Sequence, residues 1–268
     1  MLIEKILVAI TFHYDESRLK YLRDVCLQIP SLGFQYQVLV ITNTREKEAV
    51  ESINDQIKFL SNYELVNHPP MGHPYFLPWG HLPLFKQYFS TDASISHFMY
   101  LEDDIEITSK NIIYWLRGRN ELYQFGFYPS FVRFEKNHIN GMSYATDITE
   151  QLRIKKLPSV RISSDYCYVS SPQPYQGMYL MDREMLGEYF QSPASSPDFG
   201  GWGIREKATQ GLTFIGVPAP FHSRNLIGYS ELRNAIDRDA LIHHLPNNYA
   251  NNAQSEFGKI LVDKLISI

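Results

Sequence analysis

Short apolar runs alternate with segments of helical periodicity in the first hundred residues, and this alternation limits the fold more than any other feature. Residues 5–11 (KILVAIT) and 37–43 (QVLVITN) are almost wholly apolar and end in polar residues. Runs of this kind are typical of strands that are covered on both faces. Between them, apolar side chains recur at the spacing of a helix: Leu19, Leu22, Val25, Cys26 and Ile29.

The same alternation continues as far as residue 101. Residues 49–60 have helical periodicity, and residues 64–67 form a short apolar run. A further helix is expected around 84–89 and a further buried strand at 98–101. Strand–helix–strand repeats of this kind form right-handed parallel crossovers. The sequence therefore predicts an α/β fold with a Rossmann-like, mostly parallel central sheet flanked by helices.

The second half of the chain is less regular. We expect strands at 129–135, 175–181 and 212–217, and helices at 186–191 and 204–211. No break in composition marks a linker, and 268 residues are enough for one domain with a proper core. We therefore predict a single domain over residues 1–268, with one half at 1–108 and a more irregular half at 109–268.

Composition excludes several classes of protein. A formal net charge of −4 gives no basic surface for nucleic acid. Cys26 and Cys167 lie inside apolar segments, so we expect buried thiols rather than a disulfide or a metal pair. No segment approaches the ~18 apolar residues of a membrane span, which leaves only peripheral membrane contact open. We expect a cytoplasmic protein.

Polar side chains follow three of the expected strands. Thr11 ends the first strand, Asn43 ends the second, and an acidic cluster (Glu102, Asp103, Asp104 and Glu106) follows the strand at 98–101. In open parallel sheets, ligands bind beyond the carboxyl ends of the strands. The three strand ends are therefore expected to meet in one crevice.

The acidic cluster favours a hard divalent cation, Mn²⁺ or Mg²⁺, because its ligands are carboxylate oxygens. Mg²⁺ takes one or two protein carboxylates and leaves the remaining positions to water and substrate phosphates. A single short cluster is then enough for a substrate that carries a diphosphate. The alternative is a solvated loop that leads into a helix capped by Ser109.

Residues 100–107 (YLEDDIEI) resemble the acidic DxD motif of nucleotide-sugar glycosyltransferases with the GT-A fold, and are most similar to the Glu-Asp-Asp variant of the N-acetylglucosaminyltransferase I type. The resemblance implies that Asp104 ligates the metal under the donor diphosphate, with Glu102 and Asp103 assisting. It also implies a nucleotide pocket at the first two strand ends: Thr11, Phe12, His13 and Asn43.

The second half carries a further part of the resemblance. Residues 175–181 (YQGMYLM) are similar to the acceptor-side strand of that family, and 198–206 (DFGGWGIRE) to the glycine- and tryptophan-rich loop before its catalytic base. Glu206 is our first candidate for the base, because the first turn of a helix keeps a carboxylate ionised. Asp198 is the reserve. The alternatives are an ion pair of Glu206 with Arg205 or Lys207, and a turn role for Asp198.

Two basic side chains near residue 222 are candidates for the phosphate side of the site. Many GT-A enzymes bring a histidine from this region to the metal, which implies His222, and Arg224 can pair with a phosphate oxygen. A purely structural role for His222 is the alternative. Two further expectations concern structure alone: Arg133 and Glu135 form an ion pair, and the adjacent His243 and His244 diverge on an extended segment.

The sequence therefore predicts a metal-dependent, inverting glycosyltransferase that moves a sugar from a nucleoside-diphosphate sugar to a hydroxyl acceptor such as a glycan. Two alternatives stay open: a non-catalytic sugar- or cation-binding module, and another metal-dependent nucleotide-sugar or phosphoryl enzyme. A phosphohydrolase with an aspartyl nucleophile would need aspartates where residues 11–13 read TFH. A nucleotidyltransferase would need a glycine-rich loop where residues 12–17 contain no glycine.

Overall fold

The computed structural model describes residues 2–68 and 73–267. These residues form two compact units, each described separately below. The first unit contains residues 2–105 and 177–212, and the second contains 106–176 and 213–267. The segment 177–212, which we expected in the second half of a single domain, therefore belongs to the first unit.

The first unit is built on a five-stranded sheet in the order β12-β4-β1-β2-β3. Its strands are β1 (Lys5–Phe12), β2 (Gln35–Thr42), β3 (Tyr63–Asn67), β4 (His97–Glu102) and β12 (Met178–Asp182). The first four run parallel, and β12 runs antiparallel to β4. The apolar runs of β1, β2 and β4 are buried, as continuous apolar strands must be when both faces are covered.

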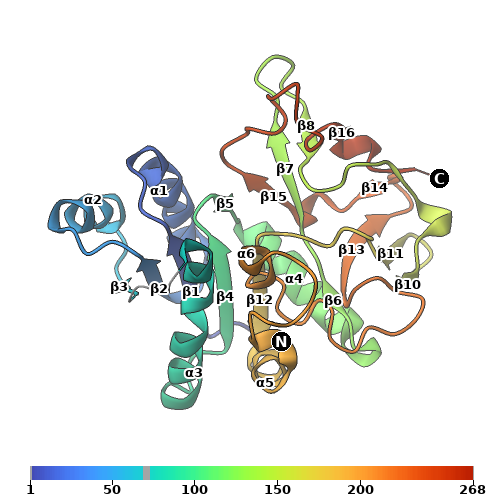
Figure 1. The fold of residues 1–268 in the computed structure, drawn as a ribbon. Coiled ribbons are helices and arrows are strands. Elements are labelled where there is room, and N and C mark those ends of the chain that lie inside the picture. Colours follow the sequence, from blue (N-terminus) through green and yellow to red (C-terminus); the bar gives the residue numbers. More distant parts are fainter. Residues whose placement is uncertain (1, 69–72, 268) are drawn as a thin grey trace. The chain divides into compact units, whose positions relative to one another are not determined.

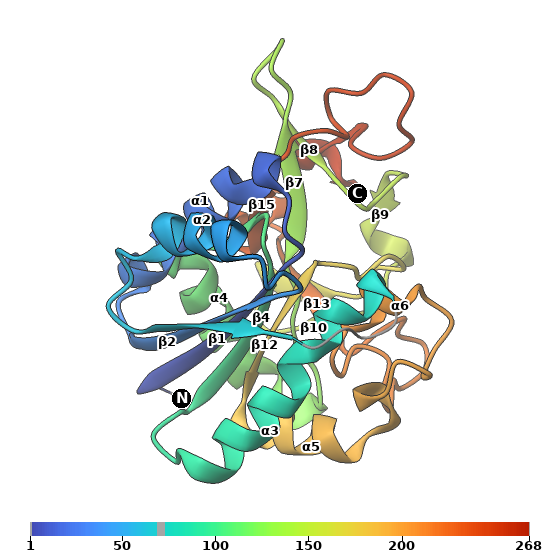
Figure 2. The ribbon, with the colours of Figure 1, turned by 60° about the vertical axis from the view of Figure 1, so that its left-hand side comes forward.

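Helices cover both faces of this sheet (Figures 1 and 2). Helices α1 (Leu19–Gln28) and α2 (Lys47–Ile57) lie on one face, and α3 (His81–Thr91) and α5 (Arg183–Gln191) on the other. The remaining helices are short: η1 (Glu16–Arg18), η2 (Ile29–Leu32), η3 (Pro74–Gly80), η6 (Pro193–Ser195) and α6 (Ile204–Lys207). The predicted α/β class with a mostly parallel central sheet is confirmed.

The second unit consists mainly of short strands. One sheet has the order β10-β11-β13-β14, with β6 beside β13, and another contains β16-β8-β7-β15. Their bounds are β6 (Tyr128–Pro129), β7 (Val132–Lys136), β8 (Ser143–Ala145), β10 (Ser159–Arg161), β11 (Tyr166–Val169), β13 (Asn225–Ser230), β14 (Ala235–Ile236), β15 (Leu241–His244) and β16 (Ile260–Leu261). Strands β9 (Leu152–Arg153) and β17 (Ile266–Ser267) form a separate pair, and β5 (Ile105–Glu106) lies where the chain passes between the units.

The long helix of the second unit, α4 (Ser109–Leu122), has a cap one residue earlier than expected. Its cap is Thr108 rather than Ser109, and the Asn111 side chain accepts hydrogen bonds from the Thr108 backbone N and Oγ1, both at 2.8 Å. The Asn111 amide then donates to the carbonyls of Asp239 and Leu241 at 2.8 Å. This residue therefore fastens the helix start to the chain entering β15. The short helices η4 (Tyr123–Phe125), η5 (Ile154–Lys156), η7 (Arg238–Ala240) and η8 (Val262–Lys264) complete the unit.

Two expectations for the segment after residue 203 are wrong. The helix expected at 204–211 stops at Lys207, because the next turns close with i→i−3 hydrogen bonds and the Thr209 hydroxyl donates to the carbonyl of Glu206. Residues 212–217 form turns rather than a strand. Gly211 and Gly216 both have left-handed backbone conformations, which break an extended chain at either end of this segment.

Both cysteines are free and buried, as expected. Among residues 2–68 and 73–267, no helix has the length and apolar character needed to cross a bilayer.

A histidine lies at the centre of the first unit. His81 is fully buried, with Nδ1 2.5 Å from the carbonyl oxygen of Pro78 and Nε2 2.5 Å from the Tyr179 hydroxyl. Its ring also packs on Tyr100, with the ring centroids 4.3 Å apart. Burial disfavours the charged imidazolium and lowers the pKa of His81 to about 3.

The pKa of His81 predicts acid sensitivity. Because its folded-state pKa is below the ordinary value of 6.5, the unfolded chain binds this proton first, and stability is lost as pH falls from 6.5 towards 3. We expect a loss of about 2–3 kcal/mol between pH 7.5 and 4.5 from this group. Urea unfolding of wild type and His81→Gln across this range measures it, with the exposed His13→Gln as control. A pH dependence that is equal in wild type and His81→Gln would show that His81 contributes nothing.

Candidate functional site

The carboxyl ends of β4, β1 and β2 meet at one edge of the first unit's sheet. In the strand register Thr11 lies opposite Glu102, and Phe12 lies opposite Thr42. Just beyond the strands, Asn43 Oδ1 accepts a hydrogen bond from the backbone N of Tyr14 at 3.0 Å. The predicted convergence of the three strand ends is confirmed.

The four residues expected to bind the nucleotide differ in how far they are exposed to solvent. Thr11 and Phe12 are buried, and Thr11 Oγ1 lies 2.7 Å from the Tyr100 hydroxyl. His13 and Asn43 are exposed and lie 3.3 Å apart, measured from Nε2 to Nδ2. Thr11 and Phe12 can therefore shape the edge mainly through their backbone, while His13 and Asn43 present side chains to a ligand.

The acidic cluster contains two buried neighbouring carboxylates, Asp103 and Asp104, and a cation that we did not predict. Arg18 donates from Nε to Asp103 Oδ2 at 3.0 Å and from Nη2 to Asp103 Oδ1 at 2.9 Å. The same Nη2 donates to Asp104 Oδ2 at 2.8 Å. Arg18 lies at the end of η1, 85 residues before Asp103 in the chain. Its only signal in the sequence is a basic residue shortly after the first strand.

Burial makes Asp103 difficult to ionise. The first cause is desolvation of the carboxylate and the second is the adjacent charge of Asp104, and together they raise the pKa of Asp103 to about 7. The hydrogen bonds and charge of Arg18 act in the opposite direction. Glu102 is less buried, and its backbone N donates to the carbonyl of Gly177 just before β12 at 3.2 Å. Ionisation at this edge is therefore favoured by a nearby cation, and Arg18 is one.

Asp103 and Asp104 suit a magnesium-type site. Across the described ranges, no group of three or more His, Cys, Asp and Glu side chains is arranged to hold a metal. Two adjacent buried carboxylates nevertheless satisfy the requirement of Mg²⁺ or Mn²⁺ when a substrate diphosphate and water supply the remaining ligands. The donor set therefore fits a divalent cation that binds together with its substrate.

In the loop before Glu206, the carboxylate of that residue lies close to the backbone of Gly203. A Cβ atom at Gly203 would lie 2.2 Å from Glu206 Oε2, so only glycine allows the carboxylate to fold back over this position. Glu206 Oε1 also accepts a hydrogen bond from Arg205 Nη2 at 3.1 Å, and its side chain is 31% exposed. The Trp79 indole donates to the carbonyl of Ile204 at 2.8 Å and fastens the loop to η3. The ion pair with Arg205, one of our alternatives, is therefore present.

Glu206 lies in the first turn of α6, as expected, and that helix has only four residues. Asp198 is exposed and makes local contacts: its backbone N donates to Ser196 Oγ at 3.2 Å, and that hydroxyl lies 3.5 Å from Oδ2. These contacts are those of the turn residue that we gave as the alternative. Both carboxylates belong to the first unit.

His222 and Arg224 lie in the second unit. His222 is exposed, and its backbone N donates to Ser170 Oγ at 2.9 Å. Arg224 donates from Nε to the carbonyl of Gly126 at 2.8 Å, so part of its guanidinium is used to hold the unit's own backbone. The strand expected before them does not form. Their roles towards metal and phosphate stay predictions.

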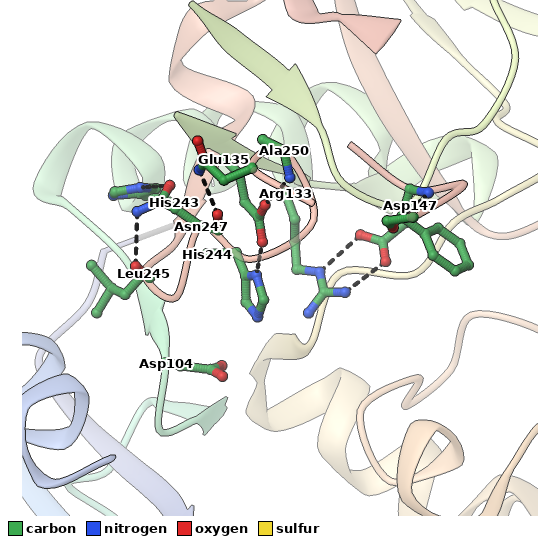
Figure 3. A network of polar contacts seen from close by, with 12 residues as sticks. Asp104, Arg133, Glu135, Asp147, His243, His244, Leu245, Asn247 and Ala250 are labelled. Atoms are coloured by element: carbon green, nitrogen blue, oxygen red, sulfur yellow. Dashed lines mark hydrogen bonds and ion pairs between the residues drawn. The ribbon is translucent and has the colours of Figure 1, made fainter. Parts of the chain in front are cut away.

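A buried histidine–carboxylate pair in the second unit was not predicted. His244 Nδ1 lies 2.5 Å from Glu135 Oε1, and the backbone N of Ala250 donates to Glu135 Oε2 at 2.6 Å (Figure 3). Arg133 pairs with Asp147 instead, at 2.6 and 2.8 Å. The expected ion pair of Arg133 with Glu135 is therefore wrong, because each of the two side chains has another partner. Arg133 pairs with Asp147, and Glu135 pairs with His244.

His243 and His244 diverge, as predicted. The His243 ring stacks on Phe134, with centroids 5.0 Å apart, and its Nε2 contacts Asn247 Oδ1 at 2.9 Å. The parallel register of β15 with β7 places His243 beside Phe134, and the next residue therefore reaches Glu135. Short sequence patterns gave no signal for the His244–Glu135 pair, because it depends on the pairing of two distant strands.

Comparisons with known proteins define the fold. No protein-family model matches the sequence, and no curated protein sequence matches it. Among solved structures, GalNAc-T7 with UDP, GalNAc and Mn²⁺ is 10% identical; the match covers 90% of this chain and 43% of that one, with a TM-score of 0.52. Residues 1–349 of S. aureus TarS are 13% identical (77% and 56% covered, TM-score 0.41). The 4-diphosphocytidyl-2C-methyl-D-erythritol synthase from Anaerococcus prevotii is 9% identical (76% and 81%, TM-score 0.38).

At 10% identity the similarity to GalNAc-T7 defines the fold alone, and the two structures with lower TM-scores add nothing to it. The fold is α/β of the GT-A type. The chain spans less than half of the GalNAc-T7 chain that it matches. The particular resemblance to the N-acetylglucosaminyltransferase I type stays a prediction.

Proposed function

We propose that this protein is a metal-dependent glycosyltransferase that moves a sugar from a nucleoside-diphosphate sugar to an acceptor hydroxyl, with inversion at the anomeric carbon. One observation carries the proposal: the buried carboxylates Asp103 and Asp104 follow β4 at the same sheet edge as the ends of β1 and β2. In a GT-A fold, that edge is where a nucleotide and its diphosphate are expected.

On the donor side, Asp104 holds Mn²⁺ or Mg²⁺, with Asp103 and Glu102 assisting. A cation held there would supply positive charge to neutralise a leaving diphosphate. Thr11, Phe12, His13 and Asn43 hold the nucleoside. The GalNAc-T7 structure contains UDP and Mn²⁺, which supports a divalent cation in this fold.

Two basic residues of the second unit are separate candidates for binding the donor. His222 is our candidate for the metal, because a neutral imidazole can ligate a divalent cation. Arg224 is our candidate for the diphosphate, because a guanidinium can donate two hydrogen bonds to phosphate oxygens.

On the acceptor side, Glu206 removes the proton of the attacking hydroxyl, with Asp198 in reserve. General-base catalysis needs the base within hydrogen-bond reach of that proton. The carboxylate of Glu206 is partly exposed, lies close to Gly203 and pairs with Arg205, so it is accessible and has a partner that can orient it.

A panel of nucleotide sugars tests the proposal, each offered with and without Mn²⁺. We expect one of them to raise the melting temperature only when Mn²⁺ is present, and to release its nucleoside diphosphate in a reaction that EDTA stops. Asp104→Asn is the matched control, because it keeps the side-chain shape and removes the charge. Stabilisation without turnover would instead identify a sugar- or cation-binding module. Turnover that persists in EDTA would contradict the metal dependence.

A further inference from the structure

The acidic pair at the end of β4 already has a cation within hydrogen-bonding distance. Arg18 makes three charge-assisted hydrogen bonds to Asp103 and Asp104, over distances of 2.8–3.0 Å. One guanidinium carries a single positive charge, which neutralises at most one ionised carboxylate of the pair. A divalent cation balances both.

We infer that Arg18 is a resident counter-cation that competes with the divalent metal for Asp103 and Asp104. The inference rests on the metal site of the proposed function. It states that the guanidinium must move away from the carboxylates before the metal can bind them. Without metal, Arg18 stabilises the acidic pair; with metal, that role passes to the ion.

The geometry makes simultaneous occupancy unfavourable. Arg18 occupies both oxygens of Asp103 and Oδ2 of Asp104, so a metal that bound through any of these three oxygens would have to displace it. A metal bound to these oxygens would lie within a few ångströms of the guanidinium, in a buried region where charges repel strongly. The two cations therefore exclude one another.

Arg18 also has an open route away from the pair. Its side chain is 34% exposed, whereas those of Asp103 and Asp104 are 10% and 9% exposed, so the guanidinium lies on the solvent side of the carboxylates. The Tyr21 ring, with its centroid 5.9 Å from the guanidinium carbon, offers a neighbouring surface on α1. Movement of one long side chain is then enough to open the carboxylates.

A competing role and a positioning role for Arg18 predict opposite changes in metal affinity when its charge is removed. If Arg18 competes, its removal strengthens metal binding. If Arg18 only holds the carboxylates in place for the metal, its removal weakens metal binding, because the two acids lose their alignment. The direction of the change in affinity therefore decides between them.

The test is calorimetric titration of the whole protein with MnCl₂ alone, without nucleotide. Arg18→Met keeps the aliphatic stem and removes the charge, and we expect it to bind Mn²⁺ roughly ten- to a hundredfold more tightly than wild type. Arg18→Lys, a point charge with fewer fixed donors, should lie between the two. Arg23→Ala, an exposed arginine on α1, is the matched control and should bind as wild type does.

A second measurement, thermal unfolding, checks that the variant is folded. Arg18→Met should melt at a lower temperature than wild type without metal, and Mn²⁺ should raise its melting temperature by more than it raises that of wild type. Equal or weaker Mn²⁺ binding by Arg18→Met overturns the inference. That result would leave the proposed function standing if wild type still turned over a nucleotide sugar in a chelator-sensitive reaction.

Discussion

Replacement of Glu206 by glutamine is expected to slow sugar transfer by roughly 10²–10⁴-fold, with donor binding nearly unchanged. An inverting transfer needs a carboxylate on the face of the sugar opposite the leaving diphosphate. Asp103 and Asp104 are assigned to the diphosphate side, so the base must come from another segment. We assign this role to Glu206, whose carboxylate lies close to Gly203 and pairs with Arg205. An amide has the same shape but cannot accept the proton.

Three controls accompany the Glu206→Gln variant. Asp198→Asn should have a milder effect, because Asp198 makes only local turn contacts. Arg205→Ala removes the partner of Glu206 and shows whether the ion pair orients the base. Thermal unfolding shows whether Glu206→Gln is still folded; if it is not, the role of Glu206 is structural. Near-normal kcat in both Glu206→Gln and Asp198→Asn would favour a retaining mechanism without a dedicated base.

Removal of the Asp104 side chain is expected to weaken metal-dependent binding of a nucleoside diphosphate by roughly an order of magnitude or more. Asp104 is buried beside Asp103, and the pair is the concentrated negative charge at this sheet edge. In Asp104→Ala the two hydrogen bonds from Arg18 to Asp103 can remain, so a metal meets one carboxylate that already has a partner. Both effects act against the metal.

Calorimetry with the diphosphate, in Mn²⁺ and in EDTA, measures this change. Glu106→Ala is the matched control: it removes an acid from the same stretch, but one whose carboxylate contacts His243 at 3.3 Å. Its metal-dependent affinity should equal that of wild type. If Asp104→Ala also binds as wild type does, the metal site must be assigned elsewhere.

Much of the first unit could be predicted because its strands are signalled locally. The apolar runs that became β1, β2 and β4 are each continuous and bounded by polar residues, so they could be read without knowledge of their neighbours. Helices α1 and α2 follow the same logic through their apolar spacing. Local patterns are enough where an element has a simple burial pattern, with both faces buried in these strands and one face buried in these helices.

In the less regular segments the strand expected at 175–181 and the helix expected at 186–191 form as β12 and α5, whereas pairing and turns were missed for a physical reason. Strand β12 joins the first unit by antiparallel pairing with β4, a contact between residues far apart in the chain. Residues 212–217 have the composition of a strand but turn at glycines with positive φ. The His244–Glu135 pair needs the parallel register of β15 with β7. None of these features can be predicted from a short stretch of neighbouring residues.

The order of residues along the chain is enough to show that an acidic cluster follows a buried strand. It also shows that two other strand ends share this edge of the sheet, because a parallel sheet aligns its carboxyl ends. The cation that neutralises the cluster could be identified only in the folded chain. Arg18 reaches Asp103 and Asp104 across 85 and 86 residues, since β1 lies beside β4 in the sheet. Charge pairing depends on the distance between residues in space, and this distance cannot be predicted from their positions along the chain.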